Sequence, residues 1–148
     1  SPFNAWVLSK SLETLEVRMD RHCSNAQYIA EKLEGNDKIN FVKYPFLASH
    51  PQHAIAKAQM KNGGGIVCFE LKGGLEAGRR FLNQIKMLSL TANLGDTRSI
   101  ASHPASTTHA KLSEAERKAT GITPGLIRIS VGLEHREDIL ADILQALS

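Results

Sequence analysis

The chain has 148 residues, 42% of them hydrophobic and 22% charged, with a formal net charge of +3. This size and composition are those of one globular domain with a real core. Its basic residues are scattered among acidic ones, so we expect no nucleic-acid partner. No apolar run approaches the roughly 18 residues of a membrane span, and no signal peptide is visible. We therefore expect no membrane partner and a cytoplasmic location.

The first 35 residues carry apolar side chains at steps of mostly three or four. This spacing predicts one long helix, which would begin at Ser1-Pro2 and end at Gly35. Such a helix would be roughly 45 Å long and would reach beyond its own domain. The residues of the stripe are Ala5, Leu8, Leu12, Leu15, Met19, Cys23, Ala26 and Leu33.

After this helix, short strands and helices alternate. The pattern predicts strands at residues 39–44, 66–71, 87–92, 99–103 and 126–133, and helices at 50–60, 74–85 and 136–147. Ser113 and Glu116 form a capping box that opens one more brief helix. The expected fold is α+β, with a small, mostly antiparallel sheet covered by helices on one face. We expect residues 1–148 to form a single domain.

The last predicted strand carries the most informative residue. Its alternation turns the isoleucines and Val131 toward the helices and Arg128 toward the opposite face. If that face meets only water, Arg128 is an ordinary surface arginine. If it meets another domain, Arg128 becomes a buried cation that requires an anion, and its planar fork matches a carboxylate. The strand pattern leaves both interpretations open.

Other candidate sites are weaker. Residues 63–65, three glycines, precede a strand rather than a helix, so a flexible loop is a better interpretation than a phosphate site. His103 and His109 have no nearby third ligand for zinc. The polar, hydroxyl-rich segment of residues 99–109 does resemble a loop that lines a site.

Two cysteines, Cys23 and Cys68, show no metal-ligand spacing. We expect both to be buried free thiols. Cys68 stands between Val67 and Phe69, which favours burial over a role as a nucleophile.

Four stretches together resemble one enzyme family. They are residues 1–6 (SPFNAW) with 12–15 (LETL), 93–96 (NLGD), 103–109 (HPASTTH) and 126–134 (LIRISVGLE). Their sequence and order are similar to the C-terminal domain of the Cys/Met-metabolism family of pyridoxal-phosphate enzymes. That family includes cystathionine γ-synthase, the cystathionine lyases, methionine γ-lyase and the O-acylhomoserine sulfhydrylases.

The resemblance implies a substrate-binding role for three residues. Arg128 would bind the substrate α-carboxylate, Asn93 would help through backbone contacts, and the Thr108 hydroxyl would lie nearby. Asn93 departs from the many members that have serine at this position. The resemblance assigns no catalytic residue, no cofactor-binding residue and no metal ligand to this chain.

In the family, the Schiff-base lysine and the other pyridoxal-phosphate ligands precede the segment that resembles residues 1–6. We therefore expect the cofactor, pyridoxal 5'-phosphate, to be held by an upstream domain of the same polypeptide. The 148-residue chain alone should then be inactive. The resemblance also implies an amino-acid substrate and a homo-oligomer, with tetramers usual for the family.

Residues 91–97, together with 49–53, are most similar to O-succinylhomoserine sulfhydrylase, with O-acetylhomoserine sulfhydrylase close behind. Such an enzyme makes homocysteine for methionine biosynthesis. Cystathionine γ-synthase, a cystathionine lyase and methionine γ-lyase remain alternatives within the family. A free-standing, non-enzymatic α+β module that binds a partner through the face of Arg128 is the alternative from another class.

Overall fold

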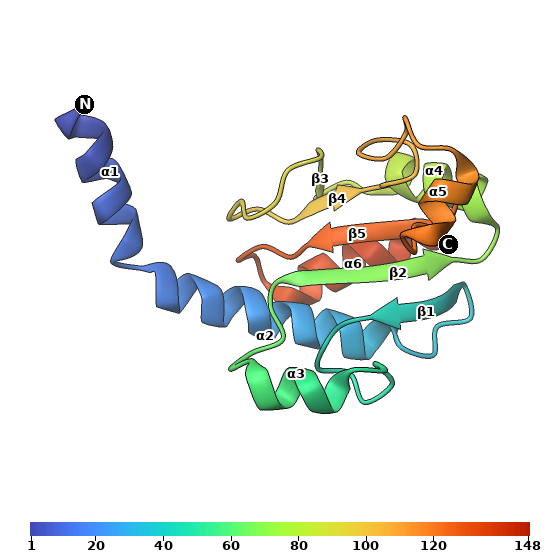
Figure 1. Ribbon diagram of the computed structural model, residues 1–148, viewed down its shortest axis with the longest axis horizontal. Coiled ribbons are helices and arrows are strands. Elements are labelled where there is room, and N and C mark those ends of the chain that lie inside the picture. Colours follow the sequence, from blue (N-terminus) through green and yellow to red (C-terminus); the bar gives the residue numbers. More distant parts are fainter.

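The computed structural model describes residues 1–148. The structure has six helices and five strands (Figure 1), in the predicted order except that two helices replace the one predicted for residues 1–35. The strand predicted at residues 66–71 has the expected bounds. The predicted strands at 87–92 and 99–103 shorten to two and three residues. The helices are α1 (Pro2–Leu12), α2 (Leu15–Leu33), α3 (His53–Gln59), α4 (Gly74–Gln84), α5 (Glu114–Ala119) and α6 (Arg136–Ala146). The strands are β1 (Ile39–Lys43), β2 (Ile66–Leu71), β3 (Ser89–Leu90), β4 (Ile100–Ser102) and β5 (Leu126–Ser130).

The five strands form one sheet in the order β1-β2-β5-β4-β3. Neighbouring strands are antiparallel except β3 and β4, which are parallel. The expected α+β fold with a mostly antiparallel sheet is confirmed. β5 is the middle strand, so its side chains are held by neighbours on both sides.

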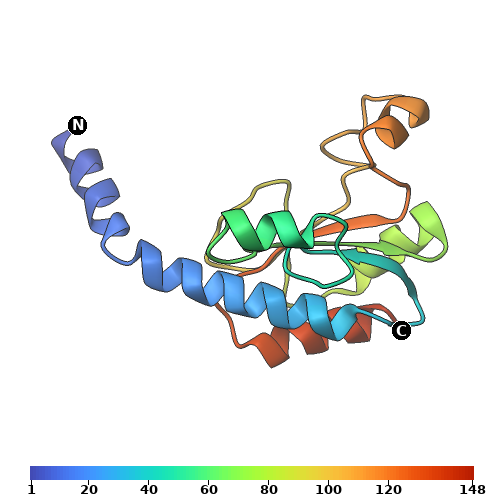
Figure 2. The ribbon, with the colours of Figure 1, turned by 60° about the horizontal axis from the view of Figure 1, so that its bottom comes forward.

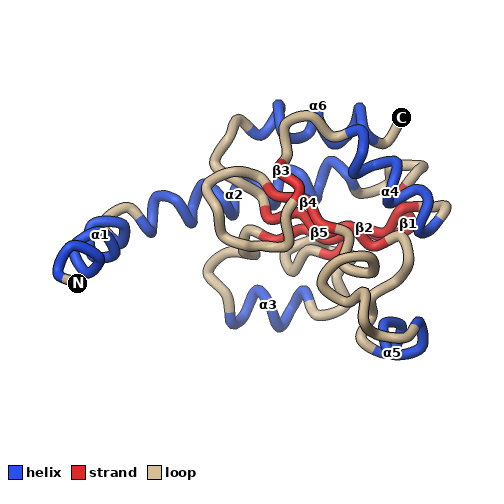
Figure 3. Tube along the Cα trace, turned by 90° about the horizontal axis from the view of Figure 1, so that it is seen from above, coloured by secondary structure: helices blue, strands red, loops and turns tan.

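Three helices, α2, α4 and α6, pack on one face of the sheet, while α3 and α5 lie on the other side (Figure 3). The core forms between the sheet and the three-helix layer. Ile127, Ile129 and Val131 belong to this core, as the strand alternation predicts. We call the opposite side of the sheet the open face.

The single long helix predicted for residues 1–35 is wrong. The chain breaks at Glu13 and Thr14 into α1 and α2. The Arg18 guanidinium bridges the break, because Nη2 donates to the Ser11 carbonyl oxygen at 2.6 Å and Nε donates to Thr14 Oγ1 at 3.3 Å. It thereby satisfies a carbonyl group that the end of α1 leaves without a helical partner.

The two helices also differ in burial. Every residue of α1 is exposed, and α1 projects away from the body of the molecule (Figure 2). The apolar stripe is therefore buried only in its second half, at Cys23, Ala26 and Leu33. Because α1 has no buried residues, no packing contact keeps it collinear with α2.

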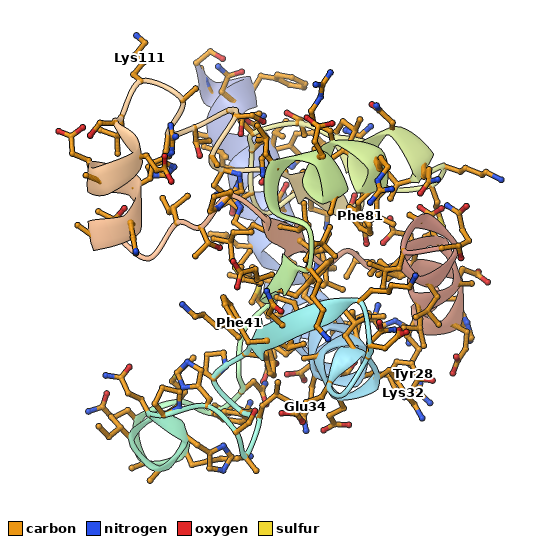
Figure 4. The ribbon with its side chains drawn as sticks, turned by 90° about the vertical axis from the view of Figure 1, so that its right-hand side faces the viewer. Tyr28, Lys32, Glu34, Phe41, Phe81 and Lys111 are labelled. Carbon is orange, nitrogen blue, oxygen red and sulfur yellow. The ribbon has the colours of Figure 1, made fainter.

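Polar side chains fix α2 against its neighbours. His22 Nδ1 lies 2.6 Å from the Val131 carbonyl oxygen, and Asn25 Nδ2 donates to the carbonyl oxygens of Gly132 and Glu134. On the outer side, the Tyr28 hydroxyl donates to Glu137 of α6; Figure 4 labels Tyr28 on α2. These contacts hold α2 to the end of β5 and to the start of α6.

The glycines of residues 63–65 have a structural role. A Cβ atom added to Gly63 would lie 2.6 Å from the buried ring of Tyr44, so the ring leaves room only for glycine. The Tyr44 hydroxyl donates to the carbonyl oxygen of Gly64 at 3.0 Å, and Gly64 has φ of +83°. This turn leads the chain into β2.

No helix of the structure is both long enough and apolar enough to cross a bilayer.

Candidate functional site

A row of four side chains crosses the open face of the sheet. The strand registers pair Lys43 with Cys68, Cys68 with Arg128, and Arg128 with Ser102. Because residues paired across strands point to the same face, all four share the side away from α2, α4 and α6. Arg128 lies on the middle strand of the sheet, between Cys68 and Ser102 in this row.

Arg128 is a partly buried cation without a carboxylate partner. None of the ion pairs in the protein includes it. Its Nη2 donates to the Ala92 carbonyl oxygen at 2.9 Å, whereas its Nε is buried and has no hydrogen-bond partner. A guanidinium in this state offers its remaining N–H groups to an anion.

The segment of residues 91–99, which bears the Ala92 carbonyl, is held against β5 and the residues that follow it. The Gly95 amide donates to Ser130 Oγ at 3.3 Å, and the Leu133 amide donates to the Thr97 carbonyl oxygen at 2.8 Å. Asp96 accepts from Arg98, and these hydrogen bonds lower the pKa of Asp96. The segment is therefore fixed beside Arg128.

Glu134 binds the C-terminal end of this segment, at Ser99. Its carboxylate accepts from both the amide and the hydroxyl of Ser99, at 2.6 and 2.9 Å, and Ser99 Oγ in turn accepts from the Gly132 amide at 2.8 Å. A Cβ atom on residue 132 would clash with Glu134 Oε2 and the Ser99 amide. Gly132 thus permits the contact that holds residues 91–99 in place.

A second loop follows β4, and buried His103 fixes it. His103 Nε2 lies 2.6 Å from the Pro124 carbonyl oxygen, and Nδ1 lies 2.8 Å from Ser106 Oγ. The His103 carbonyl oxygen accepts from Thr107 Oγ1 at 2.9 Å. His103 therefore positions the loop that joins β4 to α5. The structure contains no cluster of three or more His, Cys, Asp or Glu side chains that could hold a metal ion.

A cavity of about 240 Å³ lies where these two segments meet β4. Ala92, Ser102, His103 and Thr107 are among its lining residues. Two of these residues are neighbours of Arg128, because the Ala92 carbonyl binds its guanidinium and Ser102 is its cross-strand partner.

The three residues that the sequence predicts for substrate binding have different surroundings. Arg128 lies on the open face, as the alternation predicts. Asn93 directly follows Ala92, the residue that binds Arg128, and its side chain is exposed. Thr108 is exposed, and its hydroxyl contacts His109 Nδ1 at 2.8 Å. Its neighbour Thr107 lines the cavity, whereas Thr108 does not.

The expectation of two buried thiols holds for Cys23 and is wrong for Cys68, which is only partly buried. Val67 and Phe69 are in the core, while Cys68 points to the open face, because consecutive residues of a strand face opposite ways. Burial raises the pKa of the Cys68 thiol, and the charges of Arg128 and Lys43 oppose this rise. A raised pKa makes Cys68 a weak nucleophile.

Ser102 was not singled out from the sequence, although it lies in the segment of residues 99–109 that was predicted to line a site. It is 4% exposed, and its Oγ has no hydrogen-bond partner. A small polar residue that ends a short apolar strand, after Ile100 and Ala101, is the one signal that could have indicated it.

Comparison with known proteins assigns the family. The sequence profile for Cys/Met metabolism PLP-dependent enzymes matches residues 1–148. The chain belongs to this family. An L-methionine γ-lyase of Fusobacterium nucleatum subsp. polymorphum is 51% identical over 146 residues, which are 99% of this chain and 37% of that protein. An O-succinylhomoserine sulfhydrylase of Pseudomonas aeruginosa is 46% identical over 148 residues, which are all of this chain and 37% of that protein.

The fold agrees with this assignment. A crystal structure of cystathionine γ-synthase from Xanthomonas oryzae pv. oryzae, in complex with cystathionine, superposes with a TM-score of 0.92. Its sequence is 43% identical, and the match covers 99% of this chain and 38% of that one. The chain thus spans little more than a third of the length of these relatives.

The lysines of this chain do not fit the family's cofactor. Pyridoxal phosphate forms a Schiff base with an enzyme lysine, whose pKa is lowered by desolvation or by a neighbouring cation. Every lysine of this chain is exposed, and the one in the row with Arg128, Lys43, lies two strands away at the edge of the sheet. We assign no cofactor contact to these residues.

Proposed function

We propose that this chain is the part of a pyridoxal-phosphate enzyme that binds the α-carboxylate of an O-acylhomoserine substrate. The intact enzyme would be a sulfhydrylase, which replaces the acyloxy group by sulfide to give homocysteine and the free carboxylic acid. O-Succinylhomoserine is the proposed substrate, and methionine biosynthesis is the proposed pathway. The similarity of residues 91–97 and 49–53 to O-succinylhomoserine sulfhydrylase supports this choice.

The observation that carries the proposal is the state of Arg128. It is a partly buried guanidinium on the middle strand, without a carboxylate partner, and a backbone carbonyl holds one of its terminal nitrogens. A substrate carboxylate would supply the missing anion, and two parallel hydrogen bonds would fix its orientation. Asn93 and Thr108 would contribute from the segments beside it.

The chain would therefore bind and orient the amino acid. The cofactor, held by an upstream domain of the same polypeptide, would supply electron withdrawal from the substrate. Orientation by a carboxylate clamp lowers the entropic part of the barrier. We also propose that the intact protein is cytoplasmic and forms a homo-oligomer, a tetramer in solution. Sedimentation of the full-length protein would test the oligomeric state.

Methionine γ-lyase is the second candidate, because the Fusobacterium nucleatum enzyme is 51% identical to this chain. Both reactions begin from an amino acid with a leaving group on the γ-carbon, so the carboxylate contact is common to them. The sequence identities of this chain, 51% to the lyase and 46% to the O-succinylhomoserine sulfhydrylase, are also too similar to separate the two activities.

One experiment separates the candidates. The full-length protein, loaded with pyridoxal phosphate, is given O-succinylhomoserine, O-acetylhomoserine or L-methionine, each with and without sulfide. Our proposal predicts homocysteine from O-succinylhomoserine only when sulfide is present. Faster release of methanethiol and 2-oxobutyrate from methionine would overturn it in favour of the lyase. No turnover of any of the three would refute both.

A further inference from the structure

Two unpartnered polar atoms lie opposite each other on the open face. Only four buried side-chain nitrogen or oxygen atoms lack a hydrogen-bond partner: His53 Nδ1, Ser102 Oγ, Thr123 Oγ1 and Arg128 Nε. Two of these four belong to residues that the register of β4 and β5 pairs directly, Ser102 and Arg128. Buried polar groups in native proteins normally have hydrogen-bond partners, so two unpartnered groups on directly paired residues require a physical reason.

The two groups are chemically complementary. The guanidinium Nε–H is a donor only, whereas a serine hydroxyl both accepts and donates. Side chains paired across antiparallel strands have Cβ atoms about 4.5–5.5 Å apart, within reach of a hydrogen bond between their ends. Rotation of the short Ser102 side chain between its staggered rotamers would turn Oγ toward Arg128 Nε.

We infer that Ser102 is a positioning residue for Arg128, whose Nε–H it binds when the substrate carboxylate is in place. The Ala92 carbonyl already holds Nη2 at 2.9 Å. A second contact at Nε fixes the guanidinium plane, so that the terminal nitrogens face the incoming carboxylate. Nε itself is shielded from solvent, so we assign the carboxylate contact to the terminal nitrogens. This inference rests on the proposed role of Arg128 in binding the α-carboxylate.

The test uses the full-length, cofactor-loaded protein with Ser102 replaced by Ala. L-Norvaline, which has the α-carboxylate but no γ leaving group, serves as the binding probe, and n-butylamine serves as its counterpart without a carboxylate. By calorimetric titration, S102A should weaken L-norvaline binding roughly tenfold, the size of one hydrogen bond. Its affinity for n-butylamine should equal that of the wild type. An equal loss for both probes would mean a general structural defect and would overturn the inference.

Two matched variants complete the design. Thr123→Val removes the other unpartnered hydroxyl while preserving side-chain shape, and no register pairs it with Arg128. Its L-norvaline affinity should be that of the wild type. Ser102→Thr keeps the hydroxyl and should bind L-norvaline nearly as well as the wild type. If S102T binds L-norvaline as weakly as S102A does, with an unchanged melting temperature, the Ser102 hydroxyl does not position Arg128.

A double-mutant cycle distinguishes action through Arg128 from direct contact with the ligand. Lysine has no group equivalent to Nε–H, so S102A should cause no further loss of L-norvaline affinity in an Arg128→Lys background. The full tenfold loss in that background would overturn the inference, because Ser102 would then act without Nε. These titrations do not depend on which γ-substituted amino acid is turned over. If the sulfhydrylase assay fails, the binding data for Ser102 can therefore still be interpreted.

Discussion

Arg128 lies directly across from Cys68 in the antiparallel pairing of β2 with β5, on the open face of the sheet. Burial raises the pKa of the Cys68 thiol, and the nearby Arg128 charge offsets part of that rise. A cation favours the thiolate by Coulomb attraction, so the two residues are coupled electrostatically.

This coupling predicts the behaviour of Arg128→Met, which removes the charge but keeps a long side chain. The pKa of Cys68 should rise further, so the midpoint of its pH-dependent alkylation by iodoacetamide should move to higher pH. Cys23, a buried residue of α2, provides an internal control, because the Arg128 charge does not contribute to its pKa shift. Peptide mass spectrometry of each cysteine over a pH series gives both midpoints. An unchanged or lowered midpoint for Cys68 would contradict the coupling.

In the intact enzyme, Arg128→Ala should lower kcat/KM by a large factor. Loss of one partner of a buried, charge-assisted contact costs on the order of 2–5 kcal/mol. That corresponds to roughly 30-fold to several-thousand-fold. Arg128→Lys should recover only part of this loss, because an ammonium group does not match both carboxylate oxygens.

The comparison of two substrates tests the assignment of the α-carboxylate. O-Succinyl- and O-acetylhomoserine share this group, so Arg128→Ala should reduce kcat/KM for both by similar factors. Steady-state kinetics with the two esters measures the ratio. Selective loss of the succinyl substrate would assign Arg128 to the succinyl tail instead, and near-normal turnover would remove it from the site.

Protonation of Asp142 of α6 at acid pH should lower the free energy of unfolding. Its carboxylate accepts hydrogen bonds from the amides of Lys86, Met87 and Leu88. Desolvation alone would raise the pKa of Asp142, but these bonds outweigh it and the pKa is lowered. The unfolded value, about 3.9, is therefore the higher one. The stabilisation is present above about pH 4 and is lost as the pH falls through the folded-state pKa.

Asp142→Asn should therefore reduce the unfolding free energy at neutral pH by about 1–3 kcal/mol, since an amide is a poorer acceptor for three N–H groups. The difference from the wild type should shrink below about pH 4. Urea denaturation at several pH values measures it. A difference independent of pH would show that the carboxylate charge is not the cause.

Gly132→Ala should disturb the segment that flanks Arg128. The added methyl group would collide with Glu134 and the Ser99 amide, and overpacking of this kind costs about 1–3 kcal/mol. Gly65→Ala is the matched control, because the nearest atom to its Cβ would be His22 Cβ at an ordinary 3.4 Å. Thermal unfolding of both variants should show a larger decrease in Tm for Gly132→Ala. Equal decreases would refute the proposed close contact.

Two leucines of the apolar stripe test the break between α1 and α2. Leu33 is fully buried, and Leu12 is 65% exposed. Leu33→Ala should lower the unfolding free energy by about 2–5 kcal/mol, the usual cost of a cavity in the core. Leu12→Ala should change it by less than about 0.5 kcal/mol. Comparable losses, measured in urea on this chain, would mean that α1 packs against the body in solution.

The sequence determined the features that depend on local periodicity or on short motifs. Alternation in residues 126–133 placed Arg128 on the face opposite the helices. A run of strand-forming residues between two groups of glycines predicted β2 with its observed bounds. Motifs at residues 93–96, 103–109 and 126–134 predicted the family that the comparisons then assigned. In each case, the signal lies within about ten consecutive residues.

Only the tertiary structure decided the features that depend on contacts across the chain. The periodicity of residues 1–35 suits a helix whether or not that helix is buried, so it did not predict the break at Glu13 and Thr14. Strand register, which no local pattern fixes, brought Ser102 and Cys68 to either side of Arg128. A hydrogen-bonding group acquires its partners from residues distant in sequence, and their absence at Ser102 Oγ and Arg128 Nε is visible only in the folded chain.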